Sequence, residues 1–185
     1  MQKIPTLFLK DLNNLALVTA EPNPLCQWVF DGDGVATRKF DGTAAAIIDG
    51  ILYKRYDVKK GRQVPLNAIP CQDPDSITGH WPHWVRVNSS NKEDKYFYEA
   101  LIKQFPLKNG TYELCGPKVN GNHEGLSEHE LIEHGGERYI SPLSMLTYEN
   151  LKLFLTNENI EGIVFHHKTD GRMCKIRKSD FGIKR

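Results

Sequence analysis

The sequence lacks the features that mark secreted, membrane-bound or strongly basic proteins. Its N-terminal part has no long apolar run, since Thr6–Leu9 spans only four residues. We therefore expect no signal peptide, no membrane span or membrane partner, and a cytoplasmic protein. The net charge is only +1, so no general basic field attracts nucleic acid. Contact with a polyanion has to come from a local patch of basic residues.

Cysteine is also sparse. The four cysteines, Cys26, Cys71, Cys115 and Cys174, lie too far apart for a zinc site of the C-x-x-C kind and are too few for a disulfide scaffold. We expect free thiols in a reducing compartment. The chain has no repeat, no low-complexity tract and no linker. With 185 residues, 39% of them hydrophobic and 25% charged, it fits one globular domain over residues 1–185, which we expect to be a monomer.

Alternating apolar residues and frequent turn signals predict an α+β protein in which twisted antiparallel sheets dominate and helices flank them. Pro5, Pro22 and Pro24 indicate an irregular N-terminal arm over residues 1–25, packed on the core. Two Ser-x-x-Glu boxes, at Ser90 and Ser127, predict helix starts. We expect strands at 26–30, 35–40, 43–48, 51–56, 84–87, 111–115, 160–167 and 172–177, and helices at 90–105, 127–134 and 147–155.

The most informative stretch is Arg38-Lys39-Phe40-Asp41-Gly42. It lies between two expected strands, where a corner can present the Lys39 amine into a cleft while Gly42 lets the backbone approach a ligand closely. Alone, this short pattern is also common in exposed turns. Further segments downstream give it meaning: Arg55, Tyr112-Glu113-Leu114-Cys115-Gly116, Glu161-Gly162-Ile163-Val164 and Lys175-Ile176-Arg177.

In this order the segments resemble the serial motifs of the covalent nucleotidyltransferases, which comprise ATP-dependent DNA and RNA ligases and mRNA-capping guanylyltransferases. The resemblance covers residues 29–182 and implies an ATP-grasp-like ligase adenylation domain. DNA ligases carry an arginine where this chain has Ala44. The segments 161–166 and 174–182, and also 79–82, are similar to a family of small ATP-dependent RNA ligases.

The resemblance implies that Lys39 takes AMP from ATP. Neighbouring cations and a divalent metal favour the neutral amine that this attack requires. Lys175 and Arg177 lie two positions apart on an expected strand, so they share a face and can stabilise charge on the α-phosphate. Arginine stands where the family has a second lysine, and it keeps the charge while adding a planar fork. Glu161 is the implied ligand for Mg²⁺ or Mn²⁺, with Asp41 acting through a metal-bound water.

The remaining ATP contacts follow from the same resemblance. Glu113 matches the residue that holds a ribose hydroxyl, and Arg55 the one that contacts the sugar, the phosphates or an RNA 5′-phosphate. Val164 matches an apolar residue on the adenine face, with Tyr139 as the candidate aromatic opposite. Arg38 would lie beside the purine through its backbone. Each residue singly fits an ordinary solvated or core position; their joint placement favours function.

We therefore expect an ATP-dependent RNA ligase, without a C-terminal domain, that seals RNA ends bearing 5′-phosphate and 3′-hydroxyl groups in RNA repair. A GTP-dependent capping enzyme, a DNA ligase and a non-catalytic module that binds nucleic-acid ends remain alternatives. The segment Gly79–Trp84 is either a metal or stacking site or core packing before a strand. Phosphate contacts would come from basic residues near the site: Lys54, Lys59, Lys60, Arg62, Lys178, Lys184 and Arg185.

Overall fold

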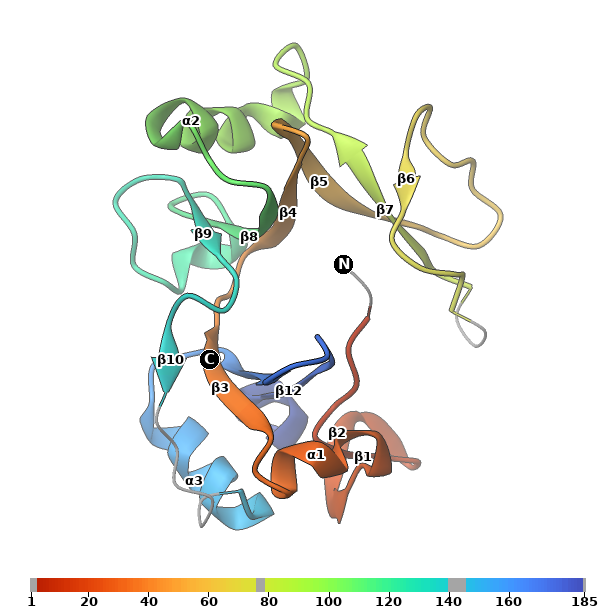
Figure 1. Ribbon diagram of the computed structural model, residues 1–185, viewed down its shortest axis with the longest axis vertical. Coiled ribbons are helices and arrows are strands. Elements are labelled where there is room, and N and C mark those ends of the chain that lie inside the picture. The colour runs from red at the N-terminus through yellow and green to blue at the C-terminus, as the bar shows by residue number, and fades with distance from the viewer. Residues whose placement is uncertain (1–2, 76–78, 140–145, 185) are drawn as a thin grey trace. The chain divides into compact units, whose positions relative to one another are not determined.

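The computed structural model describes residues 3–75, 79–139 and 146–184 (Figure 1). It is an α+β structure with mostly antiparallel sheets and few helices, as predicted. The chain forms two compact units, unit 1 from residues 1–3 and 41–134 and unit 2 from residues 4–40 and 135–185. One domain over residues 1–185 stays a prediction. No helix in the described part of the chain has the length and apolar character that crossing a bilayer requires.

Unit 1 is built on a six-stranded sheet of order β6-β7-β5-β4-β8-β9. Helix α2 (Lys95–Gln104) packs on one face of the sheet through Phe97 and Ala100, which join Ala45 and Ile47 in the core. Short 3-10 turns lie at Lys92–Asp94 and Asn120–Asn122. The strands are β4 (Thr43–Ile48), β5 (Ile51–Val58), β6 (Ile69–Pro70), β7 (Trp81–Arg86), β8 (Gly110–Cys115) and β9 (Glu130–Glu133).

The β4–β5 hairpin confirms the prediction for residues 43–56. Ile48 pairs with Ile51 across a two-residue turn. Asp49 and Gly50 both have positive φ, 51° and 73°. That combination is the twist-compatible turn favoured by Asp-Gly, which is why this local signal predicted the structure correctly.

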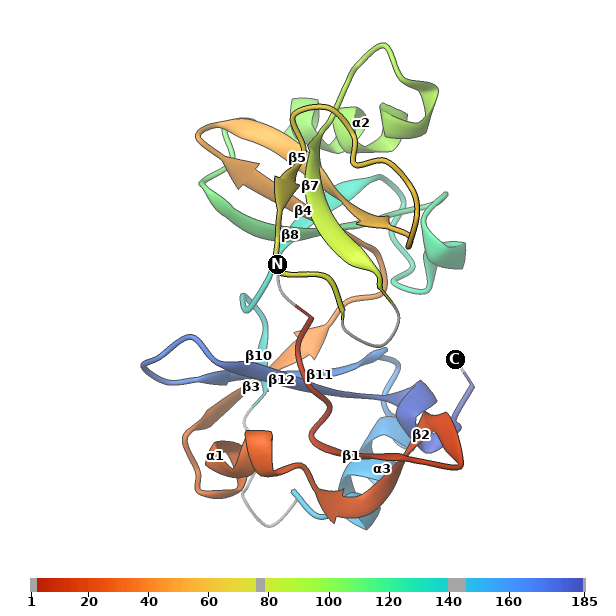
Figure 2. The same cartoon turned by 90° about the vertical axis from the view of Figure 1, so that its right-hand side faces the viewer.

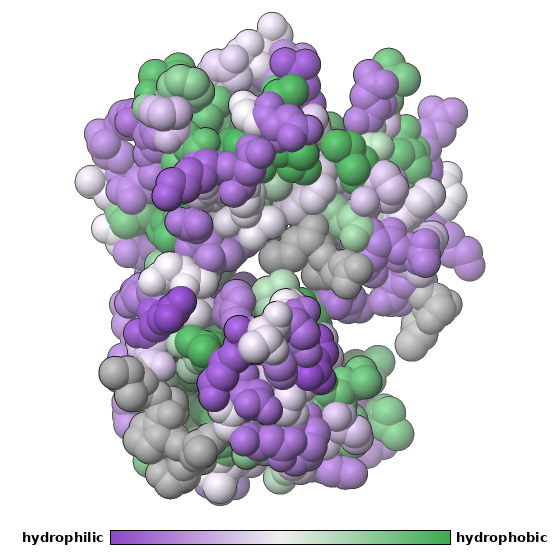
Figure 3. Space-filling model, viewed as in Figure 1, coloured by the Kyte–Doolittle hydropathy of each residue, from purple (hydrophilic) through white to green (hydrophobic). Residues whose placement is uncertain are grey.

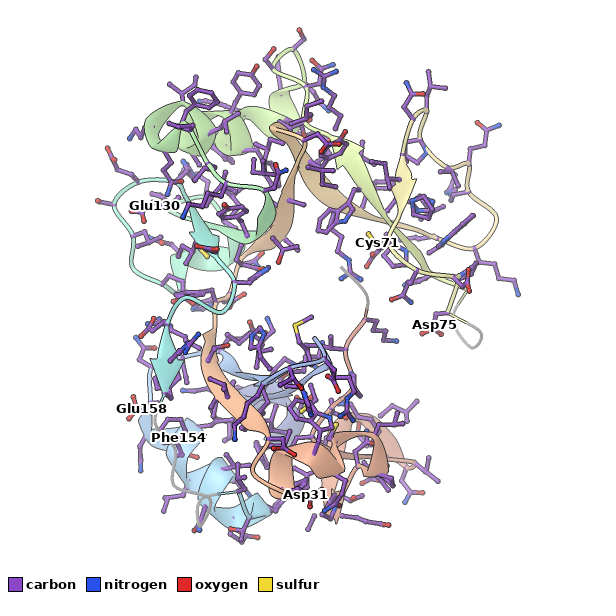
Figure 4. All side chains as sticks on the ribbon, in the orientation of Figure 1. Asp31, Cys71, Asp75, Glu130, Phe154 and Glu158 are labelled. Atoms are coloured by element: carbon purple, nitrogen blue, oxygen red, sulfur yellow. The ribbon has the colours of Figure 1, made fainter. Side chains whose placement is uncertain are left out.

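Two predictions in unit 1 are wrong. The segment expected as a helix over 127–134 is strand β9, which starts at Glu130 (Figure 4) and pairs with β8 while burying Leu131. The expected helix 90–105 is shorter, because Asn91 rather than Ser90 provides the cap by accepting the Glu93 amide. It stops before Phe105, which is 72% exposed and precedes a proline that disfavours helical backbone.

Unit 2 contains a four-stranded sheet of order β10-β3-β11-β12 and a two-stranded sheet of β1 and β2. Figures 1 and 2 show α1 and α3 on the same side of the larger sheet. Leu151 and Leu155 of α3 are fully buried there. The elements are β1 (Phe8–Asp11), β2 (Asn14–Pro22), α1 (Gln27–Phe30), β3 (Gly34–Lys39), β10 (Arg138–Tyr139), α3 (Tyr148–Asn157), β11 (Gly162–His167), β12 (Met173–Arg177) and 3-10 turns at Pro24–Cys26 and Lys178–Phe181.

Two predictions in unit 2 are also wrong. Residues 1–25 are not an irregular arm throughout, because β1 and β2 pair, with Pro22 placed at the strand end where its missing N–H is tolerated. Residues 26–30 are helical rather than extended. Asn23 caps this stretch by accepting the Leu25 amide, and Pro24 occupies the first turn. All four cysteines are free thiols, as predicted.

Candidate functional site

The register of the larger sheet in unit 2 brings four of the predicted site residues to one face. Gly162 of β11 pairs with Lys39 on one side and Arg177 on the other. Two positions along, Val164 pairs with Lys175. Because side chains alternate along strands, Lys39, Val164, Lys175 and Arg177 project together. The opposite face carries the core residues Ala36, Ile163, Phe165, Cys174 and Ile176.

Lys39 is directly paired with Glu161, the residue before β11. Its Nζ donates to Glu161 Oε2, and it also lies 3.4 Å from the Phe40 carbonyl oxygen. The two side chains are 22% and 21% exposed. The predicted nucleophile and the predicted metal ligand, far apart in the sequence, are therefore neighbours in space.

Lys175 is the most perturbed cation on this face. Burial, reinforced by the nearby charges of Arg177 and Lys39, lowers the pKa of Lys175 to about 8. Its backbone is fixed by the chain before β1, since its N–H donates to the Pro5 carbonyl (2.9 Å) and its carbonyl accepts the Leu7 amide (2.8 Å). Lys39, Lys175 and Arg177 lie near two carboxylates, Glu161 and Asp180, so only a small excess of positive charge remains, which suits an anionic ligand.

Arg177 is held by a carboxylate that the sequence interpretation missed. Its Nε and Nη2 donate to the two oxygens of Asp180, at 3.2 and 2.9 Å. Lys10 Nζ donates to the same carboxylate at 2.8 Å. Burial would raise the pKa of Asp180, but the hydrogen bonds from Arg177 and Lys10 outweigh burial and lower that pKa. The guanidinium fork expected to bind phosphate is thus engaged by Asp180.

Two motif glycines are required by neighbouring backbone. A Cβ on Gly162 would lie 2.3 Å from the Ile176 carbonyl oxygen, and one on Gly42 would lie 2.2 Å from the Leu114 carbonyl oxygen. The close approach expected at Gly42 therefore exists, but it is to strand β8 of unit 1. The glycines serve the packing of the strands that carry the site residues.

In unit 1, Arg55 and Glu113 lie on the same face of the six-stranded sheet. Ala44 pairs with Glu113, and Ala45 pairs with Lys54, so alternation places Arg55 on the face of Ala44 and Glu113. This is the face opposite α2, because Ala45 belongs to the core beneath the helix. Arg55 Nε donates to Asp57 at 3.1 Å.

Glu113 is buried and hydrogen-bonded to His134, which the sequence interpretation missed. His134 Nε2 lies 2.9 Å from Glu113 Oε2, and His134 Nδ1 lies 3.0 Å from Thr111 Oγ1. His134 follows β9, where a helix end was expected. Only the pairing of β9 with β8 reveals its place, and no local motif signals it.

Asp41 is anchored by Asn120, another residue that sequence reasoning did not identify. Asn120 Nδ2 donates to Asp41 Oδ1 at 3.0 Å and to the Gly42 carbonyl at 2.8 Å, and the Asp41 amide donates to Glu124 at 3.0 Å. Asn120 adopts a positive φ of 44°, a backbone conformation that asparagine tolerates. The Asn-Gly-Asn turn was the only local signal for it.

Two predicted nucleotide contacts lie away from Val164. Tyr139 pairs with Ala36 and packs edge-on against Phe154 of α3, with ring centroids 6.3 Å apart (Figure 4). Its alternation places it on the core face, so Tyr139 as the aromatic opposite Val164 is a wrong prediction. Arg38 pairs with the core residue Ile163, so it lies on the core face of the sheet as well. Its guanidinium is 5.0 Å from the Phe40 ring centroid.

The expected phosphate contacts divide by exposure. Lys178 is only 8% exposed, and Lys54 is paired with the buried Asp94 of unit 1. The prediction that these two lysines contact phosphate at the surface is therefore wrong. Arg185 lies outside the described residues. The face drawn in Figure 3 mixes hydrophilic and hydrophobic residues in both units. The basic residues that remain exposed are Lys59, Lys60, Arg62 and Lys184.

The aromatic segment before β7 behaves as core packing. His83 and Trp84 are buried, and His83 packs edge-on against Trp81 with centroids 4.6 Å apart. Among the residues that the structure describes, no three His, Cys, Asp or Glu side chains cluster closely enough to hold a metal ion. The packing alternative for this segment is the one that the contacts support.

No family model matches this chain, and no curated protein matches it.

Proposed function

We propose that the chain is an ATP-dependent RNA ligase built on a nucleotidyltransferase adenylation fold. The observation that carries the proposal is the common face of Lys39, Val164, Lys175 and Arg177, together with the ion pair of Lys39 and Glu161. Lys175 and Arg177 can balance the negative charge of a phosphate on this face, and Lys39 can attack that phosphate as the neutral amine once its ion pair with Glu161 is broken.

The proposed chemistry has three displacements at phosphorus. The neutral amine of Lys39 attacks the α-phosphorus of ATP, a P–N bond forms, the bond to the β-phosphate oxygen breaks and pyrophosphate leaves, while the nitrogen releases one proton that it takes up again when it is displaced. An oxygen of an RNA 5′-phosphate then displaces Lys39 and takes the AMP. Finally an RNA 3′-hydroxyl attacks that 5′-phosphate, loses its proton and expels AMP. Lys175 balances phosphate charge in each step.

Glu161 fits the proposed Mg²⁺, with Mn²⁺ as a substitute. Mg²⁺ usually keeps several waters and uses one or two carboxylates plus substrate phosphates, so a single carboxylate suits an ion that arrives with a nucleotide. The ion supplies charge neutralisation at the phosphates. The proposal further assigns Arg55 to sugar or phosphate, Glu113 to ribose, Val164 to adenine and Asp41 to a metal-bound water.

Intact-mass spectrometry after incubation with ATP and Mg²⁺ tests the proposal. The native chain should gain the mass of one AMP, and Lys39→Ala should gain none. Lys168→Ala is the matched control, because Lys168 is an exposed lysine of the same unit and its loss should leave the adduct intact. The absence of an adduct on native protein cleared of bound AMP would overturn the enzymatic proposal.

The same assay separates the alternatives. An adduct from GTP in place of ATP would indicate a capping enzyme. Where ATP gives the adduct, supplying nicked DNA and RNA substrates with 5′-phosphate ends shows which polynucleotide is sealed. The RNA ligase proposal requires sealing of RNA 3′-hydroxyl ends, and sealing of DNA alone would contradict it.

A further inference from the structure

His134 forms a hydrogen-bonded relay with the buried carboxylate of Glu113. Glu113 is 8% exposed, and its Oε2 lies 2.9 Å from His134 Nε2. On the other side of the ring, Nδ1 lies 3.0 Å from the Thr111 hydroxyl. The His134 amide also donates to the Thr111 carbonyl at 3.1 Å, so backbone and side chain together place the ring.

These contacts decide which ring nitrogen carries the proton in neutral histidine. An ionised carboxylate can only accept, so Nε2 has to donate to Glu113. Nδ1 is then an acceptor, which the Thr111 hydroxyl satisfies by donating. The Glu113 carboxylate thereby fixes the tautomer, and the Thr111 hydroxyl satisfies the other ring nitrogen. A histidine oriented in this way restricts the rotation of the carboxylate and occupies one of its two oxygens.

The second oxygen is left for a ligand. Within the described residues, the only hydrogen bond to the Glu113 carboxylate from the protein goes to Oε2, and Oε1 accepts none. The carboxylate lies on the sheet face opposite α2, between Ala44 of β4 and Ile132 of β9, the residues paired with Glu113 on its two sides. An ionised acceptor flanked by apolar side chains can receive a donor group, such as a hydroxyl, but it repels a phosphate.

We propose that His134 is a positioning residue that aims Glu113 at a ribose hydroxyl of the nucleotide and so makes the site selective for ribonucleotides. This inference rests on the proposed function, which assigns Glu113 to the ribose. Its physical basis is preorganisation. A carboxylate already held by His134 loses less rotational freedom on binding, and a ligand without the hydroxyl covers the free oxygen of Glu113 without giving it a hydrogen bond.

The test compares adenylylation with ATP, 2′-deoxy-ATP and 3′-deoxy-ATP, measured as kcat/KM for the native chain and for His134→Ala. The native chain should prefer ATP over at least one deoxy analogue by ~10-fold or more, the scale of one hydrogen bond to a charged group. His134→Ala should lose that preference by reacting more slowly with ATP, while its rate with the deoxy analogue stays unchanged. The change should appear mainly in KM.

Two further variants separate positioning from folding. His134→Gln keeps an N–H donor and should restore part of the preference. His123→Ala, which removes an exposed histidine of the same unit, should keep all of it. A His134→Ala variant that slows ATP and both deoxy analogues equally would overturn the inference, since that pattern indicates a general structural defect.

The inference and the proposed function fail in different ways. If the native chain forms the AMP adduct but His134→Ala keeps the full preference for ATP, only the role of His134 is refuted. If the native chain forms no adduct with any nucleotide, the proposed function is refuted, and the inference fails with it.

Discussion

Lys39 and Glu161 form a direct ion pair within unit 2, although 122 positions separate them in the sequence. The register of β11 against β3 creates this contact, because Gly162 sits opposite Lys39 and Glu161 immediately precedes it. The pair joins the proposed nucleophile to the proposed metal ligand. A metal ion bound by Glu161 would compete with the Lys39 ammonium for the carboxylate.

The ion pair leads to a prediction for Glu161→Gln. Loss of the carboxylate should reduce adenylylation ~100-fold or more, the scale of losing one preorganised charged group at a reacting centre. Single-turnover adduct formation at saturating Mg²⁺ measures it. Glu158→Gln, an exposed change in the same unit (Figure 4), should have no effect. Equal rates for native protein and Glu161→Gln would contradict the assignment.

The lowered pKa of Lys175 makes the stability of the folded protein depend on pH. Its folded pKa of about 8 is below its ordinary value, so between the two values the unfolded chain binds more protons and stability rises with pH. At pH 7 the folded protein carries a half-buried cation at Lys175, and Lys175→Met should be more stable by about 1–3 kcal/mol. Denaturant unfolding should show this difference shrinking as pH rises from 8 toward 10.5. A constant difference would show that the charge is not the cause.

We expect the substitution Asp180→Asn to lower the stability of the protein. Asp180→Asn leaves Arg177 and Lys10 without their shared carboxylate; because these cations are 31% and 30% exposed, losing the charged hydrogen bonds should cost about 1–3 kcal/mol. Because the folded pKa of Asp180 is lowered, this stabilisation is complete above the carboxylate's ordinary pKa and is lost as pH falls through the folded value. Urea unfolding at neutral and acid pH measures both effects.

A matched control for Asp180 is available in the same unit. Asp170 accepts a hydrogen bond from Arg172 in the exposed turn between β11 and β12. Exposed ion pairs of this kind add little to stability. Asp170→Asn should therefore leave the unfolding midpoint nearly unchanged. If both substitutions lower the midpoint equally, the burial of Asp180 is not what gives it weight.

We expect the fold to be destabilised when even one methyl group is added at Gly162. Gly162→Ala would place a Cβ 2.3 Å from the Ile176 carbonyl oxygen, which forces β11 and β12 apart and should cost about 1–3 kcal/mol or more. Thermal unfolding measures the loss. Gly171→Ala meets no atom within 4 Å but has a φ of 77°, so it reports the cost of backbone strain alone. Gly162→Ala should be the more damaging of the two.

Local chemistry explains which parts of the fold were predicted correctly. The Asp49-Gly50 turn and the shared face of Lys175 and Arg177 depend on a few neighbouring residues, and both are observed. Helix α3 begins at Tyr148, one residue after the predicted start, and Thr147 caps it by accepting the Asn150 amide. In each case the residues that decide the structure lie within one turn or one strand of each other.

The failed predictions share the opposite cause. The Ser127–Glu130 box matches a helix start, yet β8 offers this segment a row of hydrogen bonds and a place in the core for Leu131. Tyr139 looked available as a stacking ring, but its pairing with Ala36 turns it to the core face. Such outcomes depend on partners that sequence spacing does not identify.

The sequence by itself determined the α+β class, the β4–β5 hairpin, the free thiols and the order of segments that resembles the nucleotidyltransferases. Only the tertiary structure decided which charged groups meet. It paired Lys39 with Glu161, bound Arg177 to Asp180 and placed His134 beside Glu113. The reason is physical: strand direction follows from local alternation and turns, whereas the register between distant strands depends on burying both of their apolar faces at once.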